Sequence, residues 1–163
     1  MKLRKARALK QLKRSVECRE VLTEVQRLDG NNKELKQLTD SLDEEDNRRQ
    51  VDQGKEKAGE LLKSGQVQEA LIIYQDLLKK VSLTGFDDIL LYCSLLLNKS
   101  VGHLRMEEYD DIISLCIRGV KIIKNFRNRV LSFEKITKDS KEKLMNFEVR
   151  FLTRRGNAYL KQG

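Results

Sequence analysis

The chain has 163 residues, of which 36% are charged and 39% hydrophobic, and its formal net charge at pH 7 is +8. This length suffices for one or two small domains or for a few stacked repeats. The longest apolar stretches, such as ILLYCSLLL, fall well short of the roughly 20 residues that a membrane-spanning helix needs. We therefore expect a chain without a membrane segment.

The apolar residues recur at spacings of three and four, and the chain contains no proline, so an all-α fold is predicted. In chain order, we expect helices at residues 2–13, 16–28, 33–45, 51–64, 67–82, 86–106, 109–134 and 141–162. Short polar or glycine-containing turns separate several of them, at residues 29–32, 63–65, 83–85 and 137–139.

Two local patterns refine these helices. Ser41 followed by Glu44 matches a capping box and predicts a new helical turn inside the acidic segment TDSLDEEDNRRQ. The segment VKIIKNFRNRVLSFEKI carries an apolar stripe, which predicts that the helix before it continues through this segment. The stripe consists of Ile122, Ile123, Phe126, Val130 and Phe133.

The cysteines and the N-terminus indicate a reducing, cytoplasmic environment. Cys18, Cys93 and Cys116 are odd in number, lack the CxxC spacing and lie in apolar helical patterns, so we expect small buried side chains. The basic N-terminal segment MKLRKARALKQLKRS lacks the apolar stretch of a secretory signal. The positive charge of the chain would attract an acidic protein partner. Nucleic acid is a less favoured partner, because aromatic residues are sparse and acidic residues lie between the basic ones.

No residue pattern in the chain indicates catalysis. His103 is the only histidine and lies in a predicted helix beside Leu104, where packing or solvent exposure accounts for it. The sequence shows no phosphate-binding loop and no nucleophile motif, and the acidic run at residues 44–46 is typical of a solvated segment. We therefore expect a protein that is not an enzyme and that uses no cofactor, metal or small-molecule substrate.

Several segments of the chain resemble one another, as in repeat proteins. KSGQVQEALIIYQDLL places Gly65 in a turn, Ala70 in the next helix and Tyr74 four residues later. LLLNKSVGHLRMEEYDDIISLCIRGV repeats this scheme, with Ser100 and Gly119 where helices would approach closely. RKARALKQLKRSVECREVLTEVQRLDGNN and RRGNAYLKQG carry further parts of it, at Cys18, Gly30, Gly156, Ala158 and Tyr159.

These segments resemble tetratricopeptide (TPR) repeats, and the resemblance implies a solenoid of antiparallel helix pairs. It divides the chain into a TPR-like repeat at 1–32, a charged helical linker at 33–50, repeats at 51–84 and 85–126, an extended helix or insertion at 127–146, and the first helix of a truncated repeat at 147–163. The truncation would leave the last helix without a covering partner helix. The consensus tryptophan and the repeat-ending proline of the family are missing, and an unrelated helical bundle remains the alternative.

The resemblance also implies a function, because TPR co-chaperones hold the acidic C-terminal tail of a heat-shock chaperone in a concave groove. Their two-carboxylate clamp is matched by Lys55, Asn98, Arg150 and Arg154, with Gly59 in place of an asparagine. Further cations are expected along the groove at Lys63, Arg105 and Lys161. The arrangement is similar to that of adaptors with TPR blocks in tandem, including axonemal dynein assembly factors.

Three functions follow from these patterns, in decreasing order of support. The first is a peptide-binding scaffold that recognises a carboxylate. The second is a structural TPR scaffold that binds a helix or a protein surface without carboxylate recognition, through apolar residues such as Leu97, Val101 and Leu104. Nucleic-acid binding is the third.

Overall fold

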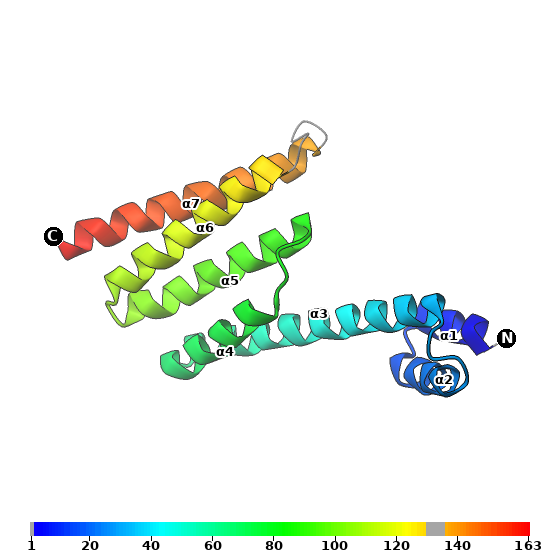
Figure 1. Ribbon diagram of the computed structural model, residues 1–163. Coiled ribbons are helices and arrows are strands. Elements are labelled where there is room, and N and C mark those ends of the chain that lie inside the picture. Colours follow the sequence, from blue (N-terminus) through cyan, green and yellow to red (C-terminus); the bar gives the residue numbers. More distant parts are fainter. Residues whose placement is uncertain (1, 130–135) are drawn as a thin grey trace. The chain divides into compact units, whose positions relative to one another are not determined.

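The computed structural model describes residues 2–129 and 136–163, and within these ranges the chain is all-α, without strands (Figure 1). The chain divides into two compact units, Met1–Gln50 and Val51–Gly163. Residues 130–135 lie outside the described residues, and with them Val130 and Phe133 of the predicted apolar stripe. Among the described helices, none combines the length and the apolar character needed to cross a membrane.

The first unit is built from α1 (Lys2–Gln11), α2 (Ser15–Leu28) and the first part of α3 (Lys33–Lys63). Arg19 on α2 pairs with two carboxylates of α3, with Nη1 at 2.8 Å from Asp43 Oδ1 and Nη2 at 2.6 Å from Asp46 Oδ2. Apolar side chains from the three helices form a core of their own, made of Ala6, Leu9, Cys18, Val21, Leu22, Val25, Leu35 and Leu42.

Helix α3 is continuous where the sequence predicts two helices, at 33–45 and 51–64. Ser41 lies inside this helix and accepts a hydrogen bond from Lys10 Nζ, so the predicted capping box with Glu44 was wrong. Residues 43–50 contain no glycine or proline that would end a helix. Leu42 and Val51 are both buried at either end of this charged stretch. The segment therefore stays helical despite its many charges.

The second unit consists of the rest of α3 with α4 (Val67–Lys80), α5 (Phe86–Arg105), α6 (Tyr109–Arg129) and α7 (Lys138–Gln162). Consecutive helices of this unit run in opposite directions, and α5 also contacts α7 (Figure 1). Gly65 forms the turn before α4 with a φ of 87°, a left-handed conformation that glycine adopts without strain. Thr137 caps α7, because its Oγ1 accepts a hydrogen bond from Ser140 N at 3.2 Å.

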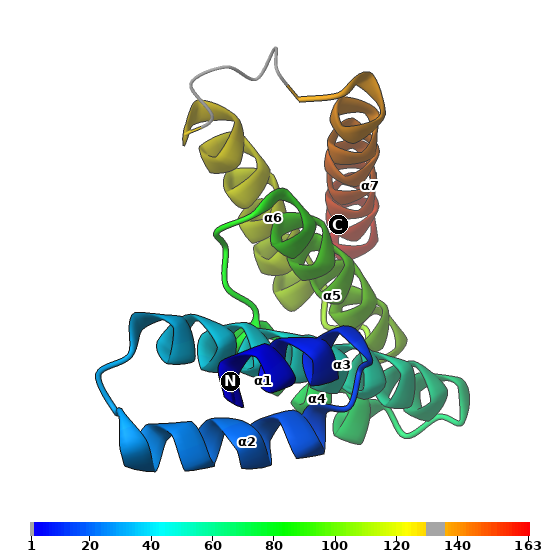
Figure 2. The same cartoon turned by 90° about the vertical axis from the view of Figure 1, so that its right-hand side faces the viewer.

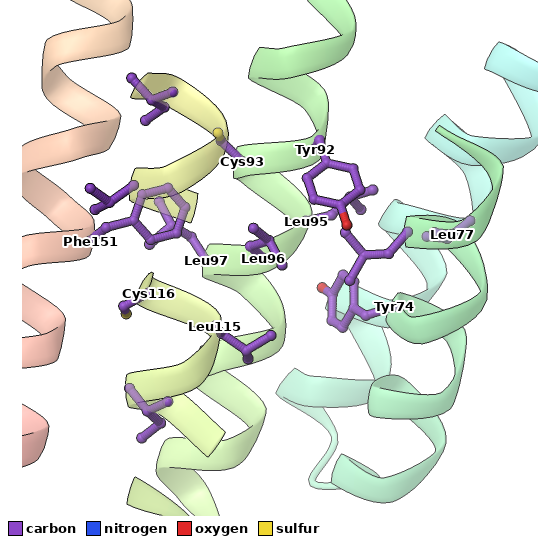
Figure 3. Close-up of a cluster of buried hydrophobic side chains, with 14 of the residues drawn as sticks. Tyr74, Leu77, Tyr92, Cys93, Leu95, Leu96, Leu97, Leu115, Cys116 and Phe151 are labelled. Carbon is purple, nitrogen blue, oxygen red and sulfur yellow. The ribbon is translucent and has the colours of Figure 1, made fainter. Parts of the chain in front are cut away.

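The core of the second unit runs from α3 to α7. Tyr74 of α4 and Tyr92 of α5 lie near each other, while Phe151 reaches from α7 toward α6 (Figure 3). Ile123 and Phe126 of the predicted stripe on α6 are buried. All three cysteines of the chain are buried and free, which confirms the expectation for these residues. Cys93 and Cys116 belong to this core and Cys18 to that of the first unit.

Gly119 of α6 lies in close contact with Phe151 of α7. A Cβ atom added there would lie 2.3 Å from Cζ of Phe151, a distance that no side chain tolerates without movement. Gly102 on α5 is similarly close to Leu71 on α4, with 2.7 Å from an added Cβ to Cδ2. The predicted close packing at Gly119 is thus confirmed, and Ser100, predicted to pack in the same way, has no exposed surface.

Candidate functional site

A cavity of about 670 Å³ lies along α7 and brings together three of the predicted site residues, Arg150, Arg154 and Lys161. They share one side of the helix because residues four and seven positions apart lie above one another. Apolar and neutral side chains complete the lining, and no acidic residue contributes to it. These residues are Leu104, Ile112, Val149, Thr153, Asn157, Ala158 and Leu160.

Arg154 fastens α7 to α5. Its Nη1 donates hydrogen bonds to the carbonyl oxygen of Leu97 at 2.7 Å and to the hydroxyl oxygen of Ser100 at 2.6 Å. Burial lowers the pKa of the Arg154 guanidinium, and the nearby charge of Arg150 lowers it further. Because a guanidinium has five N–H donors, Nε and Nη2 still carry three that these two bonds do not use.

Arg150 and Lys161 are exposed and have fewer constraints. The Arg150 guanidinium carbon lies 5.8 Å from the ring centroid of Phe147, at the distance of a cation–π contact. Among the described residues, no carboxylate forms an ion pair with Arg150, Arg154 or Lys161. The positive charge of this cavity is therefore not neutralised by acids of the described chain.

A second cavity, of about 480 Å³, is lined by three more of the predicted residues, Lys55, Asn98 and Lys63. Gly59, which stands in place of the clamp asparagine, also lines it. Asn98 makes a side-chain hydrogen bond with Tyr74, whose pKa is raised by burial and lowered by this bond. Three acids face the same space, so its charge is mixed rather than basic: Asp52, Glu56 and Glu60.

Arg105, the remaining predicted cation, lies in neither cavity. Its Nη1 donates a hydrogen bond to the carbonyl oxygen of Leu62, near the C-terminal end of α3. The Leu62 carbonyl also accepts a hydrogen bond from Gly65 N at 3.2 Å, and the additional bond from Arg105 joins α5 to α3. The structure therefore gives Arg105 a packing contact and places it apart from the α7 cavity.

Sequence reasoning missed two polar residues of the α7 cavity, Thr153 and Asn157. Both lie three positions from a predicted arginine, at Arg150 and Arg154, and this helical spacing was a usable signal. The contact of Arg154 with the Leu97 carbonyl had no such signal, because a backbone oxygen looks the same at every position.

One group of side chains in the described ranges has donor atoms close enough to hold a metal ion. His103, Glu108 and Asp111 offer ligand atoms within 4.8 Å of one another. His103 Nδ1 lies 2.6 Å from Glu108 Oε2, so these two residues already pair across the turn between α5 and α6. This pairing accounts for their geometry without an ion.

Comparisons with known proteins add no relative to this description. A scan against protein-family models matched nothing, and searches of curated proteins and of solved structures likewise gave no match.

Proposed function

We propose that residues 51–163 form a TPR-like scaffold, without enzymatic activity, that binds a partner peptide through a carboxylate. The supporting observation is the α7 cavity, where Arg150, Arg154 and Lys161 meet with no acid among the lining residues. The acidic C-terminal tail of a heat-shock chaperone is the ligand that fits this chemistry and the TPR resemblance. Such a role corresponds to a cytoplasmic co-chaperone or assembly-factor adaptor.

The chemistry of the cavity suits the end of an acidic peptide. Arginine binds carboxylates in a two-pronged geometry, and such charge-assisted bonds are about twice as strong as neutral ones. Leu104 and Leu160 are 47% and 82% exposed, so they offer apolar surface to an aliphatic side chain beside the carboxylate. Together these features favour a ligand with a carboxylate next to an apolar residue.

The main anchor for the peptide lies at α7, and Lys55 and Asn98 contribute less to binding. Three carboxylates share their cavity with two lysines, so an acidic peptide gains little attraction there. Gly59 further lowers the affinity of this cavity for a carboxylate, because it supplies no side-chain amide where the TPR clamp has an asparagine. We expect a Gly59→Asn variant to bind more tightly, since an added Cβ at this position meets only the Tyr74 hydroxyl, at 4.0 Å.

Calorimetry with a short peptide ending in Glu-Glu-Val-Asp tests the proposal. The free-acid peptide should bind, and its C-terminally amidated twin should bind roughly tenfold or more weakly, because one charge-assisted hydrogen-bond acceptor is lost. Arg150→Ala should weaken the free acid to a similar degree. Lys124→Ala, which removes an exposed lysine of α6 outside both cavities, is the matched control and should leave the affinity unchanged.

Arg154→Ala is a poor test of binding, because this substitution also removes the hydrogen bonds to Leu97 and Ser100. A loss of affinity in that variant could come either from the missing contact with the peptide or from the weaker packing of α7 on α5. Equal affinity of the free-acid and amidated peptides would reject carboxylate recognition.

The second candidate, a scaffold that binds a helix or surface without a carboxylate, is favoured by the apolar lining of the same cavity. Leu97 cannot supply that contact, because it is only 1% exposed, whereas Leu104 can. Under this alternative, Leu104→Ser weakens binding more than Arg150→Ala does.

A further inference from the structure

The side of α7 that points away from the core carries a regular apolar stripe. Met145, Val149, Leu152, Gly156 and Tyr159 follow one another at intervals of four, three, four and three residues. The exposed fractions are 57% for Met145, 58% for Val149, 43% for Leu152 and 53% for Tyr159. Leu160, at 82%, extends the stripe toward the α7 cavity. We call this set of residues the outer stripe.

The outer stripe is distinct from the buried side of the same helix. Leu144, Phe151 and Ala158, spaced seven residues apart, are buried in the core, and the partly buried Phe147 packs against it. An amphipathic surface helix needs one apolar side, whereas α7 has two, the buried side and the outer stripe. In Figures 1 and 2, α7 lies beside α6 at one end of the row of helices in its unit.

Exposed large apolar side chains are concentrated on this one helix. Among the described residues of the second unit, α4, α5 and α6 carry one each, at Ile72, Leu104 and Ile117. Scattered exposure of that kind is ordinary, whereas a contiguous row marks a surface that contacts something. Gly156 in the middle of the row has open space around it, since an added Cβ would meet no atom within 4 Å. A second helix can therefore approach closely there.

We propose that the outer stripe binds one amphipathic helix of a partner protein, with acidic residues beside its apolar seam. Alternating intervals of four and three residues are the spacing at which two helices pack side by side along their length. This inference goes beyond the proposed function, because a helix lying along α7 requires no terminal carboxylate. Met145, Leu152, Gly156 and Tyr159 of the outer stripe lie outside the α7 cavity, and Val149 and Leu160 border both.

The charge of α7 selects the occupant. Arg155 lies three positions after Leu152 and four before Tyr159, on the side of the outer stripe, whereas Arg150, Arg154 and Lys161 line the α7 cavity. Glu148, next to Val149, already pairs with Arg127 at 2.5 Å, and α7 carries no acidic residue from Val149 to Gln162. A second copy of this chain would bring the same cations together, which opposes pairing. A helix with glutamate or aspartate along its flanks has the complementary charge, and opposite charges across a helix pair set the choice of partner.

The experiment measures fluorescence anisotropy with a labelled helical peptide of about three heptads, with leucine at the seam and glutamate at the flanks. A twin with lysine at the flanks is the charge control. The acidic peptide should bind the whole chain, and the basic twin should bind roughly tenfold or more weakly. The double substitution Leu152→Ser and Tyr159→Ser should weaken the acidic peptide by about tenfold or more, since both residues lie at the centre of the seam.

Ile72→Ser is the matched control for these substitutions, because it removes an exposed apolar side chain from α4 and should leave binding unchanged. Thermal melts should show all variants folded, as the altered residues are at least 43% exposed. Equal binding of both peptides, or binding that survives the double substitution, would overturn the proposal. A dimer in sedimentation that the double substitution dissociates would also overturn it, because the occupant would then be a second copy.

Discussion

Replacing Gly119 by alanine tests how tightly α6 and α7 are packed. In a helix interior, alanine is favoured over glycine by about 1 kcal/mol. The new methyl carbon, however, would lie 2.3, 2.5 and 2.6 Å from Cζ, Cε2 and Cε1 of Phe151. Overpacking of a core costs about 1–3 kcal/mol. We expect a cost near the upper end of this range, because the Phe151 ring is fully buried and the new methyl group would be too close to three of its atoms. We therefore expect the free energy of unfolding to fall by about 2 kcal/mol.

Urea denaturation followed by circular dichroism measures this loss. Gly156→Ala on α7 is the matched control, because a Cβ there meets nothing within 4 Å, and it should raise the free energy of unfolding by up to about 1 kcal/mol. Adding Phe151→Leu to Gly119→Ala should recover part of the loss, since the smaller side chain makes room. If Gly119→Ala were as stable as the original chain, the close approach of the two helices would be refuted.

Four further predictions concern buried or half-buried polar groups. Tyr92→Phe removes a buried hydroxyl without a hydrogen-bond partner among the described residues, so urea titration should show equal or higher stability, by up to about 1 kcal/mol. Tyr74→Phe, which breaks a hydrogen bond, should instead lower it. Arg154→Ala removes two hydrogen bonds donated by a charged group and should cost about 1–3 kcal/mol, while Ser100 Oγ still donates to the Leu97 carbonyl at 2.7 Å. An unchanged melting temperature would contradict the role of Arg154 in joining α7 to α5. Burial raises the pKa of the Cys93 thiol from 9.0 to about 12, so as the pH rises the thiol ionises in the unfolded chain before it does in the folded one. The free energy of unfolding, measured by urea titration, should therefore fall from pH 9 upward, and more steeply than in Cys93→Ala.

Much of the helical arrangement could be predicted from the sequence, because the turns carry local signals. Gly65 and Thr137 mark turns whose conformation depends on a few neighbouring residues. Ser41 shows the limit of such signals, since a capping pattern says where a helix is able to start and not whether the preceding one ends. Residues 43–50 contain no glycine or proline that would end the helix, and the helix therefore continues through them.

The candidate site depended on contacts that the sequence does not display. Arg150, Arg154 and Lys161 lie on one helix, so their common side followed from spacing alone. Whether Lys55 and Asn98 would join them depended on the packing of α3, α5 and α7, and the structure places them in a separate cavity. The outer stripe was present in the sequence too, but spacing could not distinguish it from the buried side of α7.

Arg154 has two roles, because its Nη1 donates hydrogen bonds to α5 and the same residue lines the α7 cavity. An anion arriving at Nε and Nη2 would hold the guanidinium in place and reinforce the link to the Leu97 carbonyl. The amides of α5 near this link should then exchange their hydrogens with deuterated solvent more slowly when the cavity is filled. Hydrogen exchange at the contact between α5 and α7 would thus report whether the α7 cavity is occupied, without an attached dye.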